Sequence, residues 1–437
     1  MAVHLRGSAV ASTNKSPLPI LAAGGAQPFM ASPVGFAISE VTTPREDRAW
    51  ICDGSANGGA TTGGGMNARG LRRFLLLVVA TLLSLGCLSV YSATAVPSAE
   101  LYGQSVRLLL NHLLAISLGV GAGVGVLMIP LSRLRSSAKW CVLISVLLLI
   151  AVTVYGPEIG GAQRWFRIGR LSIQPSEFAQ LSLVLYLADF LARKRLVMQQ
   201  FVEGLLPPLV VLGAMAGLVL LQPDLGTAIV MGTVVFVMLM TAKADGKSLG
   251  LVAVIGLLVL GVLVAGAAYR RRRLLAFLDP WADPLGEGFQ IVQSYLALGS
   301  GGLVGTGLGQ SLQKLFYLPG SHTDFIFAMI GEELGLIGTT ALLGLFALLV
   351  LCGARLALMV DDPFGKYLIC GCVALIAFEA VVNMAVVTGL LPTKGLPLPF
   401  VSYGGTAMVG NLLACALIVR ASRTREFGMR SAECGMP

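Results

Sequence analysis

Ten long apolar runs alternate with short polar breaks between Phe74 and Arg420. A hydrocarbon core about 30 Å thick requires roughly 20 helical residues to cross it. The pattern therefore predicts an all-α polytopic membrane protein with about ten transmembrane helices. The predicted spans are 74–96, 108–131, 140–155, 172–192, 205–221, 226–242, 249–268, 325–352, 365–390 and 404–420.

The fifth and sixth predicted spans are separated only by the segment Gln222-Pro223-Asp224-Leu225-Gly226. Proline and glycine both interrupt helices, and both favour turns. Two interpretations follow. The segment is either a tight turn between two helices or a kink within a broken pair.

The composition supports a membrane protein: 56% of the 437 residues are hydrophobic and only 12% are charged. Soluble domains carry about 25% charged residues. A water-soluble enzyme, a disordered regulator and a coiled coil are therefore excluded. Walker, dinucleotide-binding and zinc-site spacings are all absent from the sequence, which disfavours an ATP pump and a metalloprotease.

Residues 1–70 differ from the rest, because they are rich in Gly, Ala and Ser and have no helical or strand periodicity. We predict a disordered N-terminal extension, followed by a membrane domain over 71–425 and a tail over 426–437. The extension lacks the basic start and apolar stretch of a signal peptide. Met66 opens a basic stretch that leads into the first span, so it is an alternative translation start.

The positions of Lys and Arg predict the orientation, because cytoplasmic loops carry an excess of both. Alternate breaks hold most of these residues, and we assign them to the cytoplasm together with both termini. The basic residues of these breaks are Arg69, Arg72, Arg73, Arg133, Arg135, Lys139, Arg193, Lys194, Arg195, Lys243, Lys247, Arg355, Lys366, Arg420, Arg423, Arg425 and Arg430.

Two basic clusters fall on the opposite, external side. One holds Arg164, Arg167 and Arg170, and the other comprises the run from Arg270 to Arg273 followed by Lys314. Such residues can extend to lipid phosphates at helix ends. Charge placed against the topological preference is more typical of a functional site. We therefore predict that the clusters bind an anionic ligand outside the membrane.

A long external segment, 269–324, connects the seventh and eighth predicted spans. Its stretch 289–296 is amphipathic, which predicts partial folding on the membrane surface. The segment ends at Asp324, where a carboxylate meets the start of an apolar span. A poorly hydrated carboxylate near arginines can serve as a general base. The alternative is a helix N-cap, and the two roles are compatible.

Other acids lie within or at the ends of spans. Glu177 follows Pro175 at a predicted helix start, where either a structural role or a place on a substrate pathway fits. Asp224 and Glu379 are candidates for a proton pathway in a transporter. Glu332 and Glu333 are predicted to pair with interior polar groups or cations.

Four motifs in chain order resemble the SEDS family, which comprises the FtsW, RodA and SpoVE types of bacterial division, elongation and sporulation proteins. The resemblance covers about 74–425, and the Pro-Thr-Lys-Gly form of the last motif is more similar to the FtsW type. The motifs are Gly161-Ala162-Gln163-Arg164-Trp165 with Gln174-Pro175-Ser176-Glu177; Gln222-Pro223-Asp224-Leu225-Gly226-Thr227; His322-Thr323-Asp324-Phe325-Ile326-Phe327 with Gly331-Glu332-Glu333-Leu334-Gly335; and Pro392-Thr393-Lys394-Gly395 through Ser402-Tyr403-Gly404-Gly405.

The resemblance implies a ten-helix bundle in the bacterial cytoplasmic (inner) membrane that polymerises lipid II into glycan strands at the division septum. It implies a class B penicillin-binding protein and other division membrane proteins as partners, and no nucleic acid. Asp324 matches the family's essential acid and is the expected general base. A divalent cation, Mg²⁺ or Mn²⁺, is a possible cofactor. The expected substrate-binding residues are Arg164, Trp165, Glu177, Arg270, Arg271, Arg272, Arg273, Lys314, His322, Lys394 and Ser402.

Two other functions stay open on the sequence. A lipid II flippase needs a charged path through the bilayer, and Glu177, Asp224 and Glu379 are candidates for one. A non-catalytic division scaffold that activates a partner synthase is the second. The external position predicted for Asp324 favours the enzyme.

Overall fold

The computed structural model describes residues 66–158, 161–168, 171–311 and 322–423. The predicted tail 426–437, and the predicted disordered extension up to residue 65, lie outside the described residues. The first helix already begins at Ala68, shortly before the predicted domain start at residue 71.

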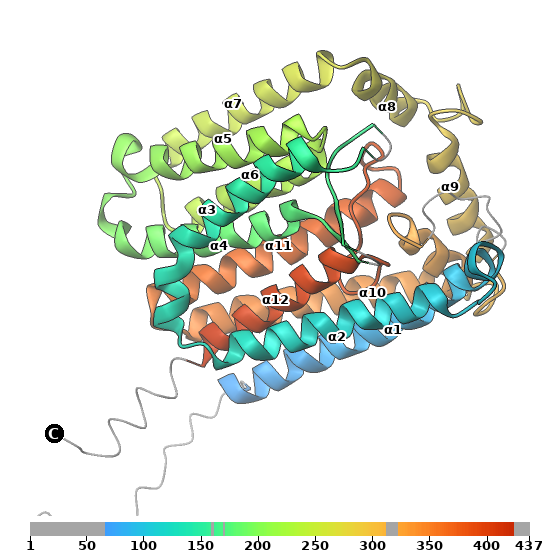
Figure 1. The fold of residues 1–437 in the computed structure, drawn as a ribbon, viewed down its shortest axis with the longest axis horizontal. Helices are drawn as coiled ribbons and strands as arrows, with labels where there is room; N and C mark the ends of the chain where they lie inside the picture. Colours follow the sequence, from blue (N-terminus) through green and yellow to red (C-terminus); the bar gives the residue numbers. More distant parts are fainter. Residues whose placement is uncertain (1–65, 159–160, 169–170, 312–321, 424–437) are drawn as a thin grey trace, which may run out of the picture. The chain divides into compact units, whose positions relative to one another are not determined.

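Each predicted span corresponds to one helix of the structure (Figure 1). In the described part of the chain, eight helical segments are long and apolar enough to cross a membrane. They are the helices given below except α4 and α6, with α5 extended by a preceding π-helical turn to Phe201–Leu221. The all-helical membrane fold is therefore confirmed, whereas the count of ten crossings stays a prediction. The helices that match the predicted spans are α1 (Ala68–Tyr102), α2 (Arg107–Met128), α3 (Leu131–Tyr155), α4 (Pro175–Arg193), α5 (Leu206–Leu221), α6 (Leu225–Thr241), α7 (Gly246–Ala265), α10 (Ile326–Met359), α11 (Pro363–Val387) and α12 (Gly405–Ser422).

The connections contain further short elements. A hairpin of β1 (Phe166–Ile168) and β2 (Leu171–Ile173) precedes α4, with Phe166 opposite Ile173. The segment between α7 and α10 contains α8 (Ala268–Leu278) and α9 (Phe289–Gly301), and α9 includes the predicted amphipathic stretch. Within the predicted external segment, the basic run Arg270 to Arg273 lies in α8.

Two predictions about helix ends are resolved by the structure. Helix α3 begins at Leu131 rather than near residue 140, because its basic first turns are helical. Helices α5 and α6 pack against each other, so the segment between them is a tight turn and the kink interpretation is wrong. The Gln222 side chain folds back from this turn and donates a hydrogen bond to Leu149 O at 3.2 Å.

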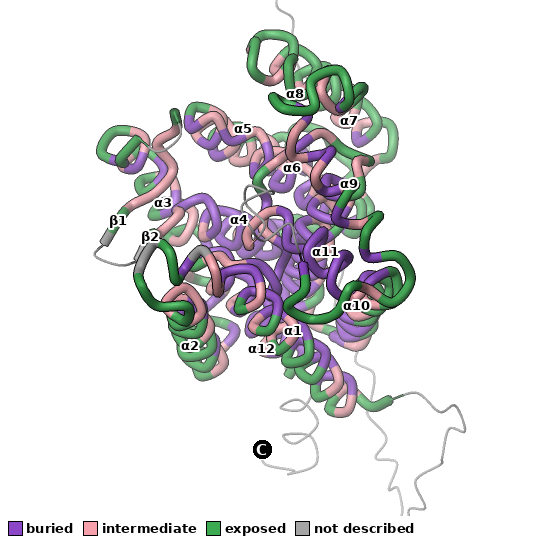
Figure 2. The backbone as a smooth tube through the Cα atoms, turned by 90° about the vertical axis from the view of Figure 1, so that its right-hand side faces the viewer, coloured by how far each residue is buried: buried purple, intermediate pink, exposed green. Residues whose placement is uncertain are grey.

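Helices α4, α11 and α12 are the most enclosed part of the bundle (Figure 2). Helix α4 packs against α3, α6 and α11, and α11 also packs against α10 and α12. Small residues allow these close approaches. A Cβ atom on Gly371 would lie 2.5 Å from Val184 Cγ1, so α11 and α4 meet with no room for a larger side chain.

The basic residues assigned to the cytoplasm gather at one end of the bundle. Arg72 of α1 donates a hydrogen bond to Ser422 O at 2.9 Å, and Arg420 of α12 donates to Ile129 O at 2.7 Å. Asp189 of α4 pairs with Arg135 at 2.9 Å and with Arg193 at 2.6 Å. This common end fits the predicted topology, although the side of the membrane on which it lies stays a prediction.

Helix α10 is broken at Gly335, which has φ 67° and ψ −162°. The preceding loop inserts at the break: Thr306 N–H donates to Glu332 O at 2.9 Å, and Leu336 N–H donates to Gly302 O at 2.9 Å. The side chain of Glu333 accepts from Ser92 Oγ at 2.5 Å. Polar contacts therefore join the loop, α10 and α1 at the break. The pairing of Glu333 with an interior polar group is as predicted.

We expect Gly335→Ala to destabilise the fold. This backbone conformation is essentially restricted to glycine and costs other residues about 1–3 kcal/mol. A Cβ atom there would also lie 2.6 Å from Leu303 O. Gly344 is the matched control, because it lies in the same helix with nothing within 4 Å of an added Cβ. Thermal unfolding in detergent should show a lower midpoint for Gly335→Ala only; equal midpoints for the two variants would contradict the argument.

Candidate active site

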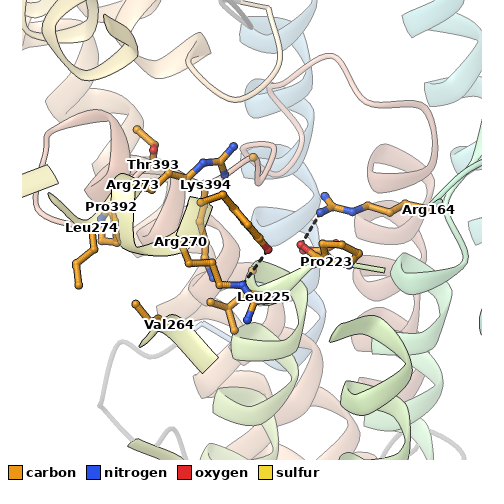
Figure 3. Close-up of a pocket in the computed structure, with 14 residues that line it drawn as sticks. Arg164, Pro223, Leu225, Val264, Arg270, Arg273, Leu274, Pro392, Thr393 and Lys394 are labelled. Carbon is orange, nitrogen blue, oxygen red and sulfur yellow. Dashed lines mark hydrogen bonds between the residues drawn. The ribbon is translucent and has the colours of Figure 1, made fainter. Parts of the chain in front are cut away.

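A cavity of about 110 Å³ lies at the end of the bundle opposite the basic end. Four segments that are distant in sequence line it (Figure 3). They are the segment before β1 through Arg164, the α5–α6 turn through Pro223 to Gly226, the stretch from Val264 to Leu274, and the loop from Pro392 to Gly395. The tertiary fold thus joins three of the four sequence motifs in one place.

Four cationic side chains line this cavity: Arg164, Arg270, Arg273 and Lys394. Arg270 and Arg273 are three residues apart in α8, so they share one helix face. Arg270 donates to Leu263 O and to Tyr269 Oη, each at 2.8 Å, and these bonds fix its guanidinium at the end of α7. Such a set of cations is suited to a ligand with several negative charges.

Arg164 holds the α5–α6 turn in place. Its Nε donates to Gln222 O at 2.7 Å, and its Nη2 donates to Pro223 O at 2.6 Å (Figure 3). The next residue, Asp224, caps α6, because its carboxylate accepts from Thr227 N–H at 3.2 Å and from Thr227 Oγ1 at 2.9 Å. Asp224 also lines the cavity, so an acid stands among the four cations.

Lys394 reaches the cavity over Gly226. An added Cβ on that glycine would lie 3.4 Å from Lys394 Cδ and 3.5 Å from Asp224 Oδ1. Among the described residues, the buried Lys394 Nζ has no hydrogen-bond partner. Burial lowers the pKa of Lys394 to about 8; Arg270 and Arg273 act in the same direction, while Asp224 opposes them.

Asp324 precedes α10 and is half-buried beside the same loop. A Cβ atom on Gly395 would lie 2.8 Å from Asp324 Oδ2, so the absence of a side chain there leaves room for the carboxylate. Within the described chain, the carboxylate accepts no hydrogen bond, and the N-cap of α10 is Phe325. Burial raises the pKa of Asp324 to about 6, with Arg273 lowering it and Asp224 raising it.

The structure separates the predicted substrate-binding residues into two groups. Arg164, Arg270, Arg273 and Lys394 line the cavity, and Asp324 lies beside it, next to Gly395 of the lining. Arg271 and Arg272 are exposed on the other face of α8, where Arg272 Nε lies 3.4 Å from Glu287 Oε1. Their predicted contact with substrate is not supported by this geometry, because successive helical residues diverge by about 100°.

The remaining predicted site residues lie outside the cavity lining. Trp165 is half-buried next to Arg164, and Glu177 is buried in the first turn of α4, where an added Cβ on Gly410 would lie 3.8 Å from its Oε2. The ring of His322 packs edge-on against Tyr403 at 5.8 Å, and burial lowers the pKa of His322. Ser402 donates to Thr323 O at 2.6 Å. Lys314 lies outside the described residues.

The site residues missed by the sequence prediction are Asp224 and Asn383. Asp224 was considered only for a proton pathway, although an acid in the break between two apolar runs was a usable signal. Asn383 lies within α11 and donates a hydrogen bond to Asp324 O at 2.8 Å. A single amide inside an apolar helix gave no sign of this contact.

An apolar groove of about 480 Å³ between α5, α6 and α7 adjoins the cavity. Leu225 lines both spaces, and Leu263 in the groove is followed by Val264 in the cavity. The groove is lined almost entirely by Leu, Val, Ile, Ala and Gly side chains. The charged cavity and the apolar groove are therefore adjacent, as a ligand with a charged head and an apolar tail requires.

The donor set of the cavity fits an anion better than a metal ion. Four cations line the cavity together with the carboxylate of Asp224, and among the described residues no three His, Cys, Asp or Glu side chains cluster closely enough to hold a metal. A divalent cation bound together with an anionic substrate stays a prediction. No step below depends on one.

Comparison with known proteins places these observations in a family. Residues 72–426 match the family model described as "Cell cycle protein", of the FtsW, RodA and SpoVE type. A probable peptidoglycan glycosyltransferase FtsW of Geobacter metallireducens is 41% identical over 364 residues, covering 82% of this chain and 96% of that protein. The stage V sporulation protein E of Bacillus subtilis is 40% identical over 357 residues, or 81% and 98% of the two chains.

Solved structures show the same fold. One match is a structure from a study of the "structural coordination of polymerization and crosslinking by a peptidoglycan synthase complex". It has a TM-score of 0.69 at 32% identity, covering 81% of this chain and 98% of the other. The rod shape determining protein RodA of Thermus thermophilus matches with a TM-score of 0.62 at 30% identity, covering 80% and 96%. These relatives confirm the predicted enzyme class, a peptidoglycan glycosyltransferase. The chain therefore belongs to the FtsW, RodA and SpoVE family of cell cycle proteins.

Proposed function

We propose that this membrane enzyme polymerises lipid II into glycan strands for the division septum, with Asp324 as the general base. The observation that carries the proposal is the position of Asp324, which lies against Gly395 beside the cavity that Arg164, Arg270, Arg273 and Lys394 line. Glycosyl transfer from a lipid-linked donor needs a base for the attacking hydroxyl and cations for the departing diphosphate. This one end of the bundle supplies both.

In the proposed step, Asp324 accepts the proton of the acceptor sugar hydroxyl as its oxygen attacks the anomeric carbon of the donor. The bond from that carbon to the diphosphate oxygen breaks, and the lipid diphosphate departs. The two α8 arginines and Lys394 neutralise the negative charge that develops on the leaving oxygen. The polyprenyl chain of the donor lies in the apolar groove next to Leu225.

The partner and location follow from the family and the charge pattern. One solved relative is a synthase complex that couples polymerisation to crosslinking. We accordingly propose that this chain works with a class B penicillin-binding protein, a transpeptidase. The basic end of the bundle faces the cytoplasm by the positive-inside rule, so the cavity faces outward, where lipid II is consumed.

The pH dependence tests this assignment. Asp324 acts as a base only when deprotonated, so kcat/KM should rise with pH through about 6. Lys394 binds the diphosphate only when protonated, so activity should fall as pH rises through about 8. Polymerisation of fluorescent lipid II from pH 5 to 9 should give a bell-shaped profile. Lys394→Gln should lower the maximum and remove the high-pH limb, whereas a flat wild-type profile would contradict both assignments.

A further inference from the structure

Hydrogen bonds to three consecutive carbonyl groups hold the backbone at Asp324. His322 O accepts from Tyr403 N–H at 2.9 Å, and Thr323 O accepts from Ser402 Oγ at 2.6 Å. Asp324 O accepts from Asn383 Nδ2 at 2.8 Å. The first two donors belong to the segment that follows α11, and only the third comes from within that helix.

The same Asn383 amide nitrogen makes a second bond, to Leu396 O at 2.6 Å. Leu396 lies in the loop that carries Lys394 and Gly395, and Gly395 is the residue against which the Asp324 carboxylate packs. One NH₂ group has two donors, and here they bind the backbones of Asp324 and Leu396. The amide therefore sets the spacing between Asp324 and the loop that carries Lys394.

The surroundings of Asn383 make this arrangement rigid. Its side chain is only 2% exposed and extends from α11, one of the enclosed helices of the bundle. Its Oδ1 is buried and has no hydrogen-bond partner in the described chain. An unpaired buried carbonyl is unfavourable for stability, so the cost indicates that the two donors are needed at this position.

We infer that Asn383 is a positioning residue for glycosyl transfer. Its amide holds the Asp324 backbone and the 394–396 backbone together, so that the carboxylate stands at a fixed place beside the cavity cations. This inference rests on the proposed role of Asp324 as the base. The groups that face the carboxylate are Arg273, Asp224 and the Gly395 backbone, and an Asn383 substitution changes the chemical identity of none of them.

The test compares Asn383→Leu, Asn383→Asp and Asn383→Gln in the lipid II polymerisation assay with the partner synthase. Leucine has a similar volume without donors, and aspartate presents oxygens to two carbonyl oxygens. A displacement of about 1 Å can lower a rate about 10²-fold. We expect kcat to fall about 30- to 300-fold for Asn383→Leu and Asn383→Asp and less for Asn383→Gln, which keeps both donors. KM should change less than kcat, because the cavity arginines are untouched.

The low-pH limb of the activity profile separates positioning from folding. Release of the Asp324 turn should hydrate the carboxylate and move that limb from about pH 6 toward the usual range of aspartate. Asn411 is the matched control: it is buried in α12 and donates to Ala407 O of its own helix at 3.0 Å. Asn411→Leu should reduce thermal stability and leave the limb in place.

Three outcomes would overturn the inference: unchanged kcat, an unchanged low-pH limb, or failure of every Asn383 variant to fold while Asn411→Leu folds. Asp324→Asn is assayed in parallel. If Asp324→Asn remains active, the proposed function itself fails. If Asp324→Asn is inactive and folded Asn383 variants behave like wild type, only the positioning role fails.

Discussion

Asp324→Asn is expected to lower the rate of lipid II polymerisation by about 10²- to 10⁴-fold, the usual contribution of a positioned general base. The amide has nearly the same shape and cannot accept the hydroxyl proton. The fold should tolerate the change, because within the described chain the carboxylate accepts no hydrogen bond and the N-cap of α10 is Phe325. Purified protein with its partner synthase, assayed with fluorescent lipid II, gives the measurement.

Asp245→Asn is the control for this substitution. Asp245 caps α7 at the basic end, where its carboxylate accepts from Ser248 N–H at 2.8 Å, and asparagine caps a helix nearly as well. Both variants should unfold at the wild-type temperature within a few degrees. Wild-type polymerisation by a folded Asp324→Asn variant would contradict the assignment of Asp324 as the general base. The scaffold and flippase functions would then have to be considered again.

The double variant Arg270→Gln/Arg273→Gln should raise KM for lipid II strongly. Each guanidinium lost from the diphosphate site removes a charge-assisted hydrogen bond worth about 1.5–3 kcal/mol, so kcat/KM should fall about 10²-fold or more. The bundle should remain folded, because α8 lies outside the buried centre and none of its residues is buried. Initial rates at several lipid II concentrations separate KM from kcat.

The neighbouring pair provides a control with an identical change in charge. Arg271→Gln/Arg272→Gln also removes two positive charges from α8, but both residues are exposed and neither lines the cavity. We expect less than a threefold change in kcat/KM. Equal losses in the two double variants would mean that α8 acts through its overall charge at the membrane surface, as in the alternative in which these residues extend to lipid phosphates.

The spans were predictable because hydrocarbon imposes a length and a composition on each helix. The ten predicted ranges each overlap one helix, and the largest error, at the start of α3, came from assigning basic helical turns to a loop. The break in α10 could not be predicted in this way. Gly335 resembles any other glycine in an apolar run, and only the insertion of the Leu303 to Gly305 loop requires its conformation.

The candidate site was predictable in its parts and not in its assembly. The external arginines were identified from charge placed against the topological preference, and Arg164, Arg270 and Arg273 do line the cavity. Asp324 was identified from its position at the start of an apolar span. The helical phase of the run in α8 could not be predicted from the pattern, so Arg270 and Arg273 were not separated from the two residues between them. Long-range contacts such as Asn383 to Asp324 depend on tertiary packing and leave no local pattern.

The double role of Leu225, which lines both the charged cavity and the apolar groove, has a consequence for substrate supply. Transfer of a long isoprenoid from bilayer to water would cost about 0.8 kcal/mol for each methylene group exposed. A continuous lateral route lets the hydrocarbon remain solvated by lipid or protein throughout the catalytic cycle. The donor concentration that sets the rate is then its surface density within the leaflet. Dilution of the membrane with inert lipid should therefore slow the enzyme even when the bulk concentration of the donor is held constant.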